Sequence, residues 1–220
     1  MDKSLSILNS QIEPDLVSNR SDAVATLLKG IVGATPVVGN LLAETLTQLI
    51  PNQRLDRVAE CLAIFSSKVD SLDAAFLQHK MQTEEFADLL QDVVGAAARA
   101  LSPERKEYLA ALLKNSITRE DLDHLGHKKI LGLLNELNDA EIIIVKYHSI
   151  PDQDVKWEFQ TLHSNVISGY TLPPDASQQE RDRHLMFKQN HDTIERLKLN
   201  VTDGQGYNLG RLLLQYIDLA

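Results

Sequence analysis

An apolar stretch from Gly30 to Ile50, GIVGATPVVGNLLAETLTQLI, constrains the fold of this chain more than any other segment. Its one charged residue is Glu44, and three glycines and Pro36 interrupt it. A loop is seldom so apolar, and a proline in the interior breaks a regular helix. The segment therefore predicts one of two structures: a helical hairpin buried inside a bundle, or an element that inserts into a membrane once it is released.

The length of this segment permits a membrane span, since its twenty-one residues in a straight helix reach about 31 Å and a bilayer core is about 30 Å thick. Burying Glu44 near the bilayer centre would cost about 2 to 3 kcal/mol, however, and Pro36 breaks the helix. We therefore expect a hairpin that is buried in the folded protein, with conditional insertion and an oligomer interface as open alternatives. The side chains that would form the membrane or interface contact are Ile31, Val32, Pro36, Val37, Val38, Leu41, Leu42 and Leu46.

Composition narrows the classes of function. The chain has 22 lysines and arginines against 31 aspartates and glutamates, a formal net charge of -9. This balance disfavours nucleic-acid binding, because the neutralisation of phosphates needs an excess of cations. The one cysteine, Cys61, cannot form an intramolecular disulfide, and the stretch from Met1 to Gln11 lacks the features of a secretory signal. We therefore expect a cytoplasmic protein.

The first half of the chain predicts a flexible tail over residues 1–20 and a helical bundle over residues 21–117. After the hairpin, one apolar stripe recurs with spacings of three and four and predicts a helix of about 28 residues that starts at Asn52. We expect this stripe to form bundle core, although a coiled-coil contact between subunits would have the same pattern. The stripe consists of Leu55, Val58, Leu62, Phe65, Val69, Leu72 and Phe76.

Capping residues define the next two predicted helices. Thr83 precedes a helix, and Ser102 with Pro103 occupies the N-cap and first-turn positions of another. The inward face of the helix after Thr83 consists of Phe86, Leu89, Leu90, Val93, Val94 and Ala97, and that of the helix after Ser102 consists of Leu109, Leu112, Leu113 and Ile117.

The second half, residues 118–220, predicts a smaller domain with a few short strands. Thr118 and Asp121 resemble a capping box for a helix that carries Leu122, Leu125, Ile130 and Leu134, and Asn138 with Asp139 caps the next one. The β-branched run Ile142 to Val145 favours helix, with a buried strand as the alternative. Residues 155–159 alternate as a strand does, a polar helix is predicted from Asp175 to about Leu197, and a glycine-rich turn at 203–206 predicts a β-hairpin before the last helix.

The last 24 residues, a hairpin followed by NLGRLLLQYIDL, resemble the end of bacterial winged-helix domains. This resemblance implies a winged-helix-like domain over residues 118–220, and the acidic charge favours protein contacts over DNA contacts for it. The overall layout, with an LNELNDAEIIIVKY helix and a terminal LGRLLLQYI helix, also resembles bacterial abortive-infection alpha proteins. That resemblance implies a role in defence against phage.

Polar clusters are weak candidates for chemistry. Glu120, His124 and His127 are spaced so that one helical face would carry all three, but a solvated or hydrogen-bonded histidine pair explains them better than a metal site. Cys61 has no histidine beside it in the sequence and is not expected to be a nucleophile. A stripe of Arg181, His184, Lys188 and His191 could contact phosphate or an acidic partner, although acidic neighbours favour ion pairs within the helix.

Together these features predict a mainly α protein with an N-terminal bundle around an apolar hairpin and a winged-helix-like C-terminal domain. We expect a noncatalytic defence or stress component without a cofactor or metal. In that hypothesis a protein partner controls release of the hairpin toward the inner membrane. A structural adaptor in a multiprotein complex, or a homo-oligomer, is the alternative, and a DNA-binding regulator is a weaker one.

Overall fold

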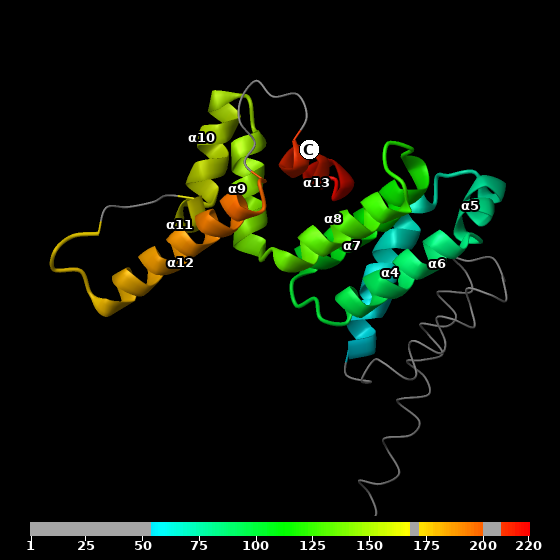
Figure 1. Ribbon diagram of the computed structural model, residues 1–220, viewed down its shortest axis with the longest axis horizontal. Helices are drawn as coiled ribbons and strands as arrows, with labels where there is room; N and C mark the ends of the chain where they lie inside the picture. The colour runs from blue at the N-terminus through cyan, green and yellow to red at the C-terminus, as the bar shows by residue number, and fades with distance from the viewer. Residues whose placement is uncertain (1–53, 168–171, 200–207) are drawn as a thin grey trace, which may run out of the picture. The chain divides into compact units, whose positions relative to one another are not determined.

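The computed structural model describes residues 54–167, 172–199 and 208–220, and these residues are mainly helical (Figure 1). They contain no strand, so the predicted mainly α fold class is confirmed for the part of the chain that is described. The chain divides into two compact units, the first ending at Lys129 and the second beginning at Ile130. The predicted boundary at 117/118 falls at the end of a helix inside the first unit. The predicted tail, hairpin and wing turn lie outside the described residues.

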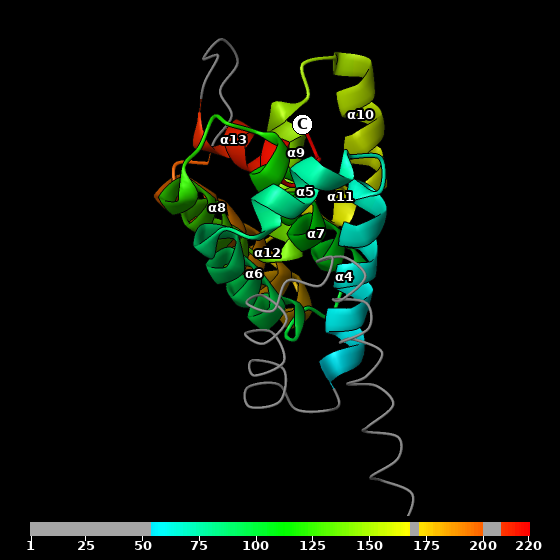
Figure 2. The ribbon, with the colours of Figure 1, turned by 90° about the vertical axis from the view of Figure 1, so that its right-hand side faces the viewer.

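The first unit is built around the packing of three helices on one another. The described helices before its boundary are α4 (Leu55–Val69), α5 (Ala74–Met81), α6 (Glu84–Ala97) and α7 (Pro103–Thr118). α7 packs along both α4 and α6, and α5 contacts α6 and α7 more lightly (Figure 2). The predicted inward faces of α6 and α7 are all buried, and the Phe65 and Phe86 rings meet with centroids 6.3 Å apart. Burial of these apolar faces is the main source of stability for the unit.

The single long helix expected from Asn52 to beyond Phe76 is wrong, because the chain turns between α4 and α5. Asp73 explains the break: its side chain accepts a hydrogen bond of 2.8 Å from the Phe76 N–H and caps a new helix. The apolar periodicity continues through the turn, but Phe76 is 40% exposed. A local N-cap therefore overrides a periodic pattern that looks continuous in the sequence.

The predicted caps of α6 and α7 are confirmed, and that of the following helix is wrong. Thr83 and Ser102 accept hydrogen bonds from main-chain N–H groups at 3.3 Å and 3.2 Å. Thr118 instead ends α7, with its hydroxyl donating to the Lys114 carbonyl. The next helix, α8 (His124–Glu136), begins after Asp123, whose carboxylate accepts from the Gly126 N–H at 2.8 Å. The boundary between the units falls within α8.

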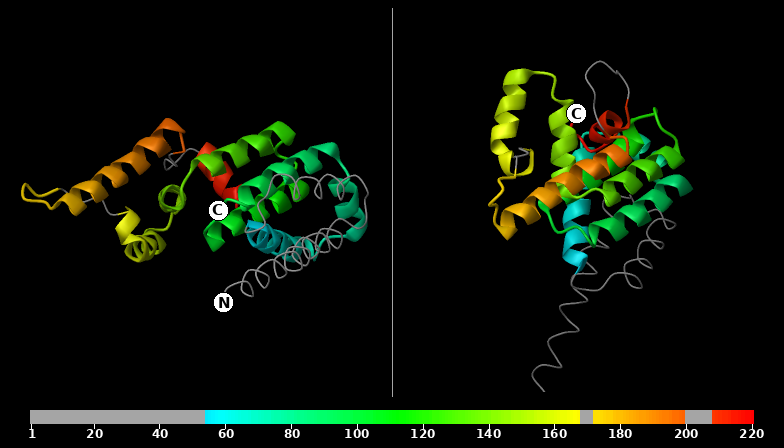
Figure 3. Two further views of the ribbon diagram at one scale, coloured as in Figure 1. Left: turned by 90° about the horizontal axis from the view of Figure 1, so that it is seen from below. Right: turned by 60° about the vertical axis from the view of Figure 1, so that its left-hand side comes forward.

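The second unit is organised around α9, which contacts α10, α11, α12 and α13 (Figure 3). Its further helices are α9 (Asp139–Ser149), α10 (Gln153–Leu162), α11 (Ser164–Ile167), α12 (Gln178–Arg196) and α13 (Leu209–Tyr216). The helical alternative for Ile142 to Val145 is confirmed, with a capping box between Asn138 and Glu141 at its start. A strong start signal thus places a β-branched run in a helix.

Two strand predictions in this unit fail. Residues 155–159 lie in α10, because Asp152 caps that helix by accepting from the Asp154 and Val155 N–H groups. The first strand of the predicted β-hairpin was expected at residues 197–201, and its described residues, 197–199, instead form the end of α12. Lys198 has φ 55° and the Leu199 N–H donates to the Ile194 carbonyl, which is the hydrogen bond of a Schellman helix end.

Candidate functional site

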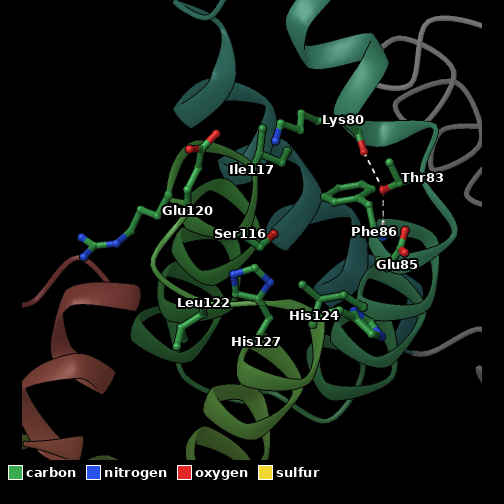
Figure 4. A pocket seen from close by; sticks show the side chains of 12 residues that line it. Lys80, Thr83, Glu85, Phe86, Ser116, Ile117, Glu120, Leu122, His124 and His127 are labelled. Carbon is green, nitrogen blue, oxygen red and sulfur yellow. Dashed lines mark hydrogen bonds between the residues drawn. The ribbon is translucent and has the colours of Figure 1, made fainter.

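A cleft of about 370 Å³ in the first unit is lined by residues of α5 to α8 and their connections (Figure 4). Its lining combines apolar side chains with polar and charged ones. The apolar side chains are Phe86, Leu89, Ile117 and Leu122, and the polar ones are Lys80, Thr83, Glu85, Ser116, Arg119, Glu120, His124 and His127.

Main-chain hydrogen bonds fix the hydroxyl groups of this cleft. The Thr83 hydroxyl donates to the Lys80 carbonyl at 2.9 Å and accepts from the Phe86 N–H, so it joins α5 to α6. The Ser116 hydroxyl donates to the Leu113 carbonyl at 2.8 Å. Each hydroxyl proton is therefore held by a carbonyl, and neither group is poised to be activated by a base.

The predicted arrangement of Glu120, His124 and His127 on one helical face is wrong, because α8 starts at His124 and Glu120 lies in the preceding connection. The three residues nevertheless line the same cleft. Burial lowers the pKa of His127, and the charge of His124 lowers it further. Among the described residues, no group of three histidine, cysteine, aspartate or glutamate side chains is placed to hold a metal ion.

His124 and Lys128 tie α8 to α6 through acidic side chains. The His124 Nε2 atom lies 2.9 Å from the Asp88 carboxylate, and Lys128 Nζ lies 2.7 Å from both Asp88 and Asp92. The hydrogen bond from Lys128 lowers the pKa of Asp88. The histidine pair thus includes a hydrogen-bonded member, as the sequence analysis preferred, and the cluster positions one wall of the cleft.

The remaining charges of the cleft suit binding of a polar group. Arg119 already forms a bidentate ion pair with Asp121, at 3.0 Å and 2.8 Å. Lys80, Glu85 and Glu120 also line the cleft and offer one cation and two carboxylates. With its hydroxyl protons engaged and a buried histidine, this arrangement can hold a polar side chain or small ligand, but it does not assemble a nucleophile, a base and an orienting group.

Cys61 is packed in the core of the first unit. Its thiol donates to the Lys106 carbonyl at 3.6 Å, and burial raises the pKa of the thiol to about 12. Since the thiolate is the reactive form, Cys61 is inert at neutral pH.

The apolar stripe that begins at Leu55 lies mostly inside a single chain. Its first five members, Leu55, Val58, Leu62, Phe65 and Val69, are buried in the first unit. Leu72 is half-buried and Phe76 is exposed. The first five positions therefore belong to the core of a single chain. A coiled-coil contact between subunits could involve only the last two, Leu72 and Phe76.

The four residues of the predicted polar stripe all lie on α12, but they differ in exposure and in their contacts. Arg181 donates from Nε to the Ala176 carbonyl at 3.0 Å, so it fastens the start of its own helix, and Lys188 is exposed. His184 and His191 are half-buried. The His191 ring lies against Phe187, with centroids 4.4 Å apart, and burial lowers the pKa of His191.

A set of exposed apolar side chains on α10 and α12 was not among the sequence predictions. α10 has no buried residue, and its Val155, Trp157 and Leu162 are 51%, 68% and 76% exposed. On α12, Leu185 and Met186 are 62% and 60% exposed. The signal for α10 in the sequence was Asp152, a capping residue that follows Pro151. In a strand Val155 and Trp157 would lie on one face, whereas in a helix they point in different directions.

The hairpin residues Ile31, Val32, Pro36, Val37, Val38, Leu41, Leu42 and Leu46 lie outside the described part of the chain. Within the described part, none of the helices combines the length and the apolar character needed to cross a membrane. Comparisons with protein-family models, curated proteins and solved structures gave no match to this chain.

Proposed function

We propose that the protein is a noncatalytic component that acts by binding a protein partner through α10 and α12 of its second unit. The observation that carries this proposal is the exposure of large apolar side chains on these two helices, above all Trp157. Tryptophan and methionine are enriched in the cores of protein interfaces, and tryptophan is prominent among interface hot spots.

The first unit provides a contrast. Among the described residues of this unit, the exposed large apolar side chains are single residues on different elements: Phe76 on α5, Leu101 in the connection before α7, and Leu125 on α8. Scattered apolar residues of this kind are ordinary on protein surfaces. In the described part of the second unit five such residues occupy two helices, and α10 buries none of its own side chains. A partner that covers α10 would supply the burial that the helix lacks.

A second candidate function adds a membrane step. The apolar segment from Gly30 to Ile50 favours a bacterial defence or stress effector in which partner binding to the second unit releases the hairpin toward the inner membrane. The resemblance to abortive-infection alpha proteins supports this context. The finer architecture of this hypothesis, a bundle that shelters the hairpin and a winged-helix-like second half, belongs to the same proposal. Leakage of dye from anionic liposomes, present in the parent and lost in Val38→Asp, tests it.

Affinity purification with matched variants tests the partner-binding proposal. Trp157→Ala and Leu185→Ala remove exposed apolar side chains from the second unit, and Leu125→Ala removes one that is 75% exposed from the first unit. We expect a protein that co-purifies with the parent and with Leu125→Ala to be lost from Trp157→Ala and reduced with Leu185→Ala. Equal recovery by all three variants would contradict the proposal.

A further inference from the structure

A second cavity, of about 440 Å³, lies within the second unit between α9, α10 and α13. Its volume is in the range of small-molecule sites, which are lined mainly by apolar side chains with a few polar groups. The apolar lining consists of Ile150, Pro151, Val155, Phe159 and Leu214, and the polar lining consists of Lys146, Ser149, Asp152, Arg211 and Gln215, with Ala220 completing the wall.

Two cations from different helices line this cavity. Lys146 belongs to α9 and Arg211 to α13, and neither side chain forms an ion pair with a carboxylate of the described residues. Lys146 is half-buried, and burial lowers the pKa of its ammonium group. The chain has a net charge of -9, and these two cations line the same cavity. Partly desolvated cations without a partner are a feature of ligand sites.

The acidic residue of the lining does not neutralise these cations by direct contact. One oxygen of Asp152 accepts hydrogen bonds from the Asp154 and Val155 N–H groups, at 2.9 Å and 3.2 Å, and thereby caps α10. The lining side chains thus carry two positive charges and one negative charge. Asp152 is engaged at the start of α10, so Lys146 and Arg211 are the charged side chains of the lining that can meet an anionic ligand.

We propose that this cavity binds a small amphipathic monoanion, a carboxylate carried on an apolar chain. The carboxylate lies by Lys146 and Arg211, and the apolar chain lies against Phe159, Leu214 and Val155. An arginine fork suits a carboxylate in particular, since it can donate two parallel hydrogen bonds to it. The activity goes beyond the proposed partner binding, because it requires only the second unit and a small molecule.

Isothermal titration of the full chain with decanoate, kept below its micelle concentration, tests the proposal. Decanol lacks the charge and acetate lacks the apolar chain, so these two probes separate the two halves of the site. We expect saturable binding of decanoate with one site per chain, and binding at least about 10-fold weaker for each control probe. Absence of saturable decanoate binding, or equal binding of decanol, would overturn the proposal.

Three variants locate the site. Lys146→Met and Arg211→Met keep most of the side-chain stem and remove the charge, and we expect each to weaken decanoate binding by about 10-fold or more. Lys188→Met removes an exposed cation of α12 outside the cavity and should leave the affinity unchanged. Lys146 also lies in the last turn of α9, where a cation stabilises the helix end. A Lys146→Met variant that melts at a lower temperature and still binds decanoate normally would show that structural role alone and refute the site. Since no protein partner is present, failure here leaves the partner-binding proposal standing.

Discussion

An ion pair joins Lys106 of α7 to Glu60 of α4, which lie 46 positions apart in the sequence. Removal of the Glu60 charge should destabilise the first unit, and only as long as Lys106 carries its positive charge. The Lys106 side chain is 10% exposed and that of Glu60 is 58% exposed. Glu60→Gln removes the charge with little change of shape and leaves a nearly buried ammonium group with a weaker partner. A hydrogen bond to a charged group contributes about 1.5 to 3 kcal/mol, and the exposure of Glu60 reduces this to about 1 to 2 kcal/mol.

Replacement of Lys106 by an uncharged residue should remove the cost of Glu60→Gln. Lys106→Met keeps the packed stem and takes the buried charge away, so we expect its stability to lie within about 1 kcal/mol of the parent. In the Lys106→Met background, Glu60→Gln should then cost less than about 0.5 kcal/mol, as an exposed surface change does. Urea denaturation followed by circular dichroism measures all four proteins of this double-mutant cycle.

A neighbouring ion pair serves as the control. Lys68 and Glu107 also link α4 to α7, at 3.3 Å, but their side chains are 25% and 51% exposed. Because solvent screens this pair more, Glu107→Gln should cost less than about 0.5 kcal/mol. The reasoning is refuted if Glu60→Gln destabilises the parent and the Lys106→Met background equally, since the cost would then not arise from the buried cation.

Three further predictions concern His191, Asn138 and Cys61. Burial lowers the pKa of His191, so the unfolded state takes up a proton before the folded state does as the pH falls below about 6.5, and the free energy of unfolding should decrease from that pH down to the folded pKa. The urea midpoint should therefore decrease less steeply between pH 7.5 and 5 in His191→Phe than in the parent. An equal decrease in both proteins would refute this prediction. Asn138→Ala removes the capping box of α9 and a 3.1 Å hydrogen bond to Asn190, and should cost about 1 to 2 kcal/mol in urea denaturation, whereas a cost near zero would contradict the cap. Cys61 should react with a thiol reagent only after unfolding, because its pKa is raised to about 12; rapid labelling of the native protein would show that it is accessible.

Periodicity and capping residues together predicted most of the helices. Thr83, Ser102 and Asn138 each cap a helix where the sequence indicates it, because a cap is a local hydrogen bond that needs no tertiary partner. The β-branched run from Ile142 to Val145 is helical because the capping box at its start and burial against the rest of the unit outweigh the weak preference of those residues for strands.

The failures arise where two local signals compete. At Asp73 the chain has both a continuous apolar stripe and a cap, and the cap interrupts the helix. In α10 the alternation of Val155, Trp157 and Phe159 imitates a strand, but the Asp152 cap selects a helix. The pattern of apolar residues alone cannot decide such cases, since short runs fit both periods.

The candidate sites were less predictable than the fold. Glu120 and His127 were found from their spacing, but the cleft they share depends on the α7–α8 connection, which the sequence placed inside a helix. Lys146 and Arg211 are 65 positions apart in the sequence, and only the packing of α13 on α9 places them in one cavity. Contacts of this kind are tertiary and leave no local pattern to detect.

The central claim is that α10 is a docking helix, and Trp157, the one tryptophan of the chain, reports on it directly. Labelling the protein with 5-fluorotryptophan gives a single fluorine resonance, and the change of its shift between light and heavy water measures contact with solvent. We predict a large solvent effect in the isolated protein, because Trp157 is 68% exposed, and its loss in the complex with the co-purified partner. A tryptophan that is shielded in the isolated protein, or equally exposed in the complex, would contradict the account.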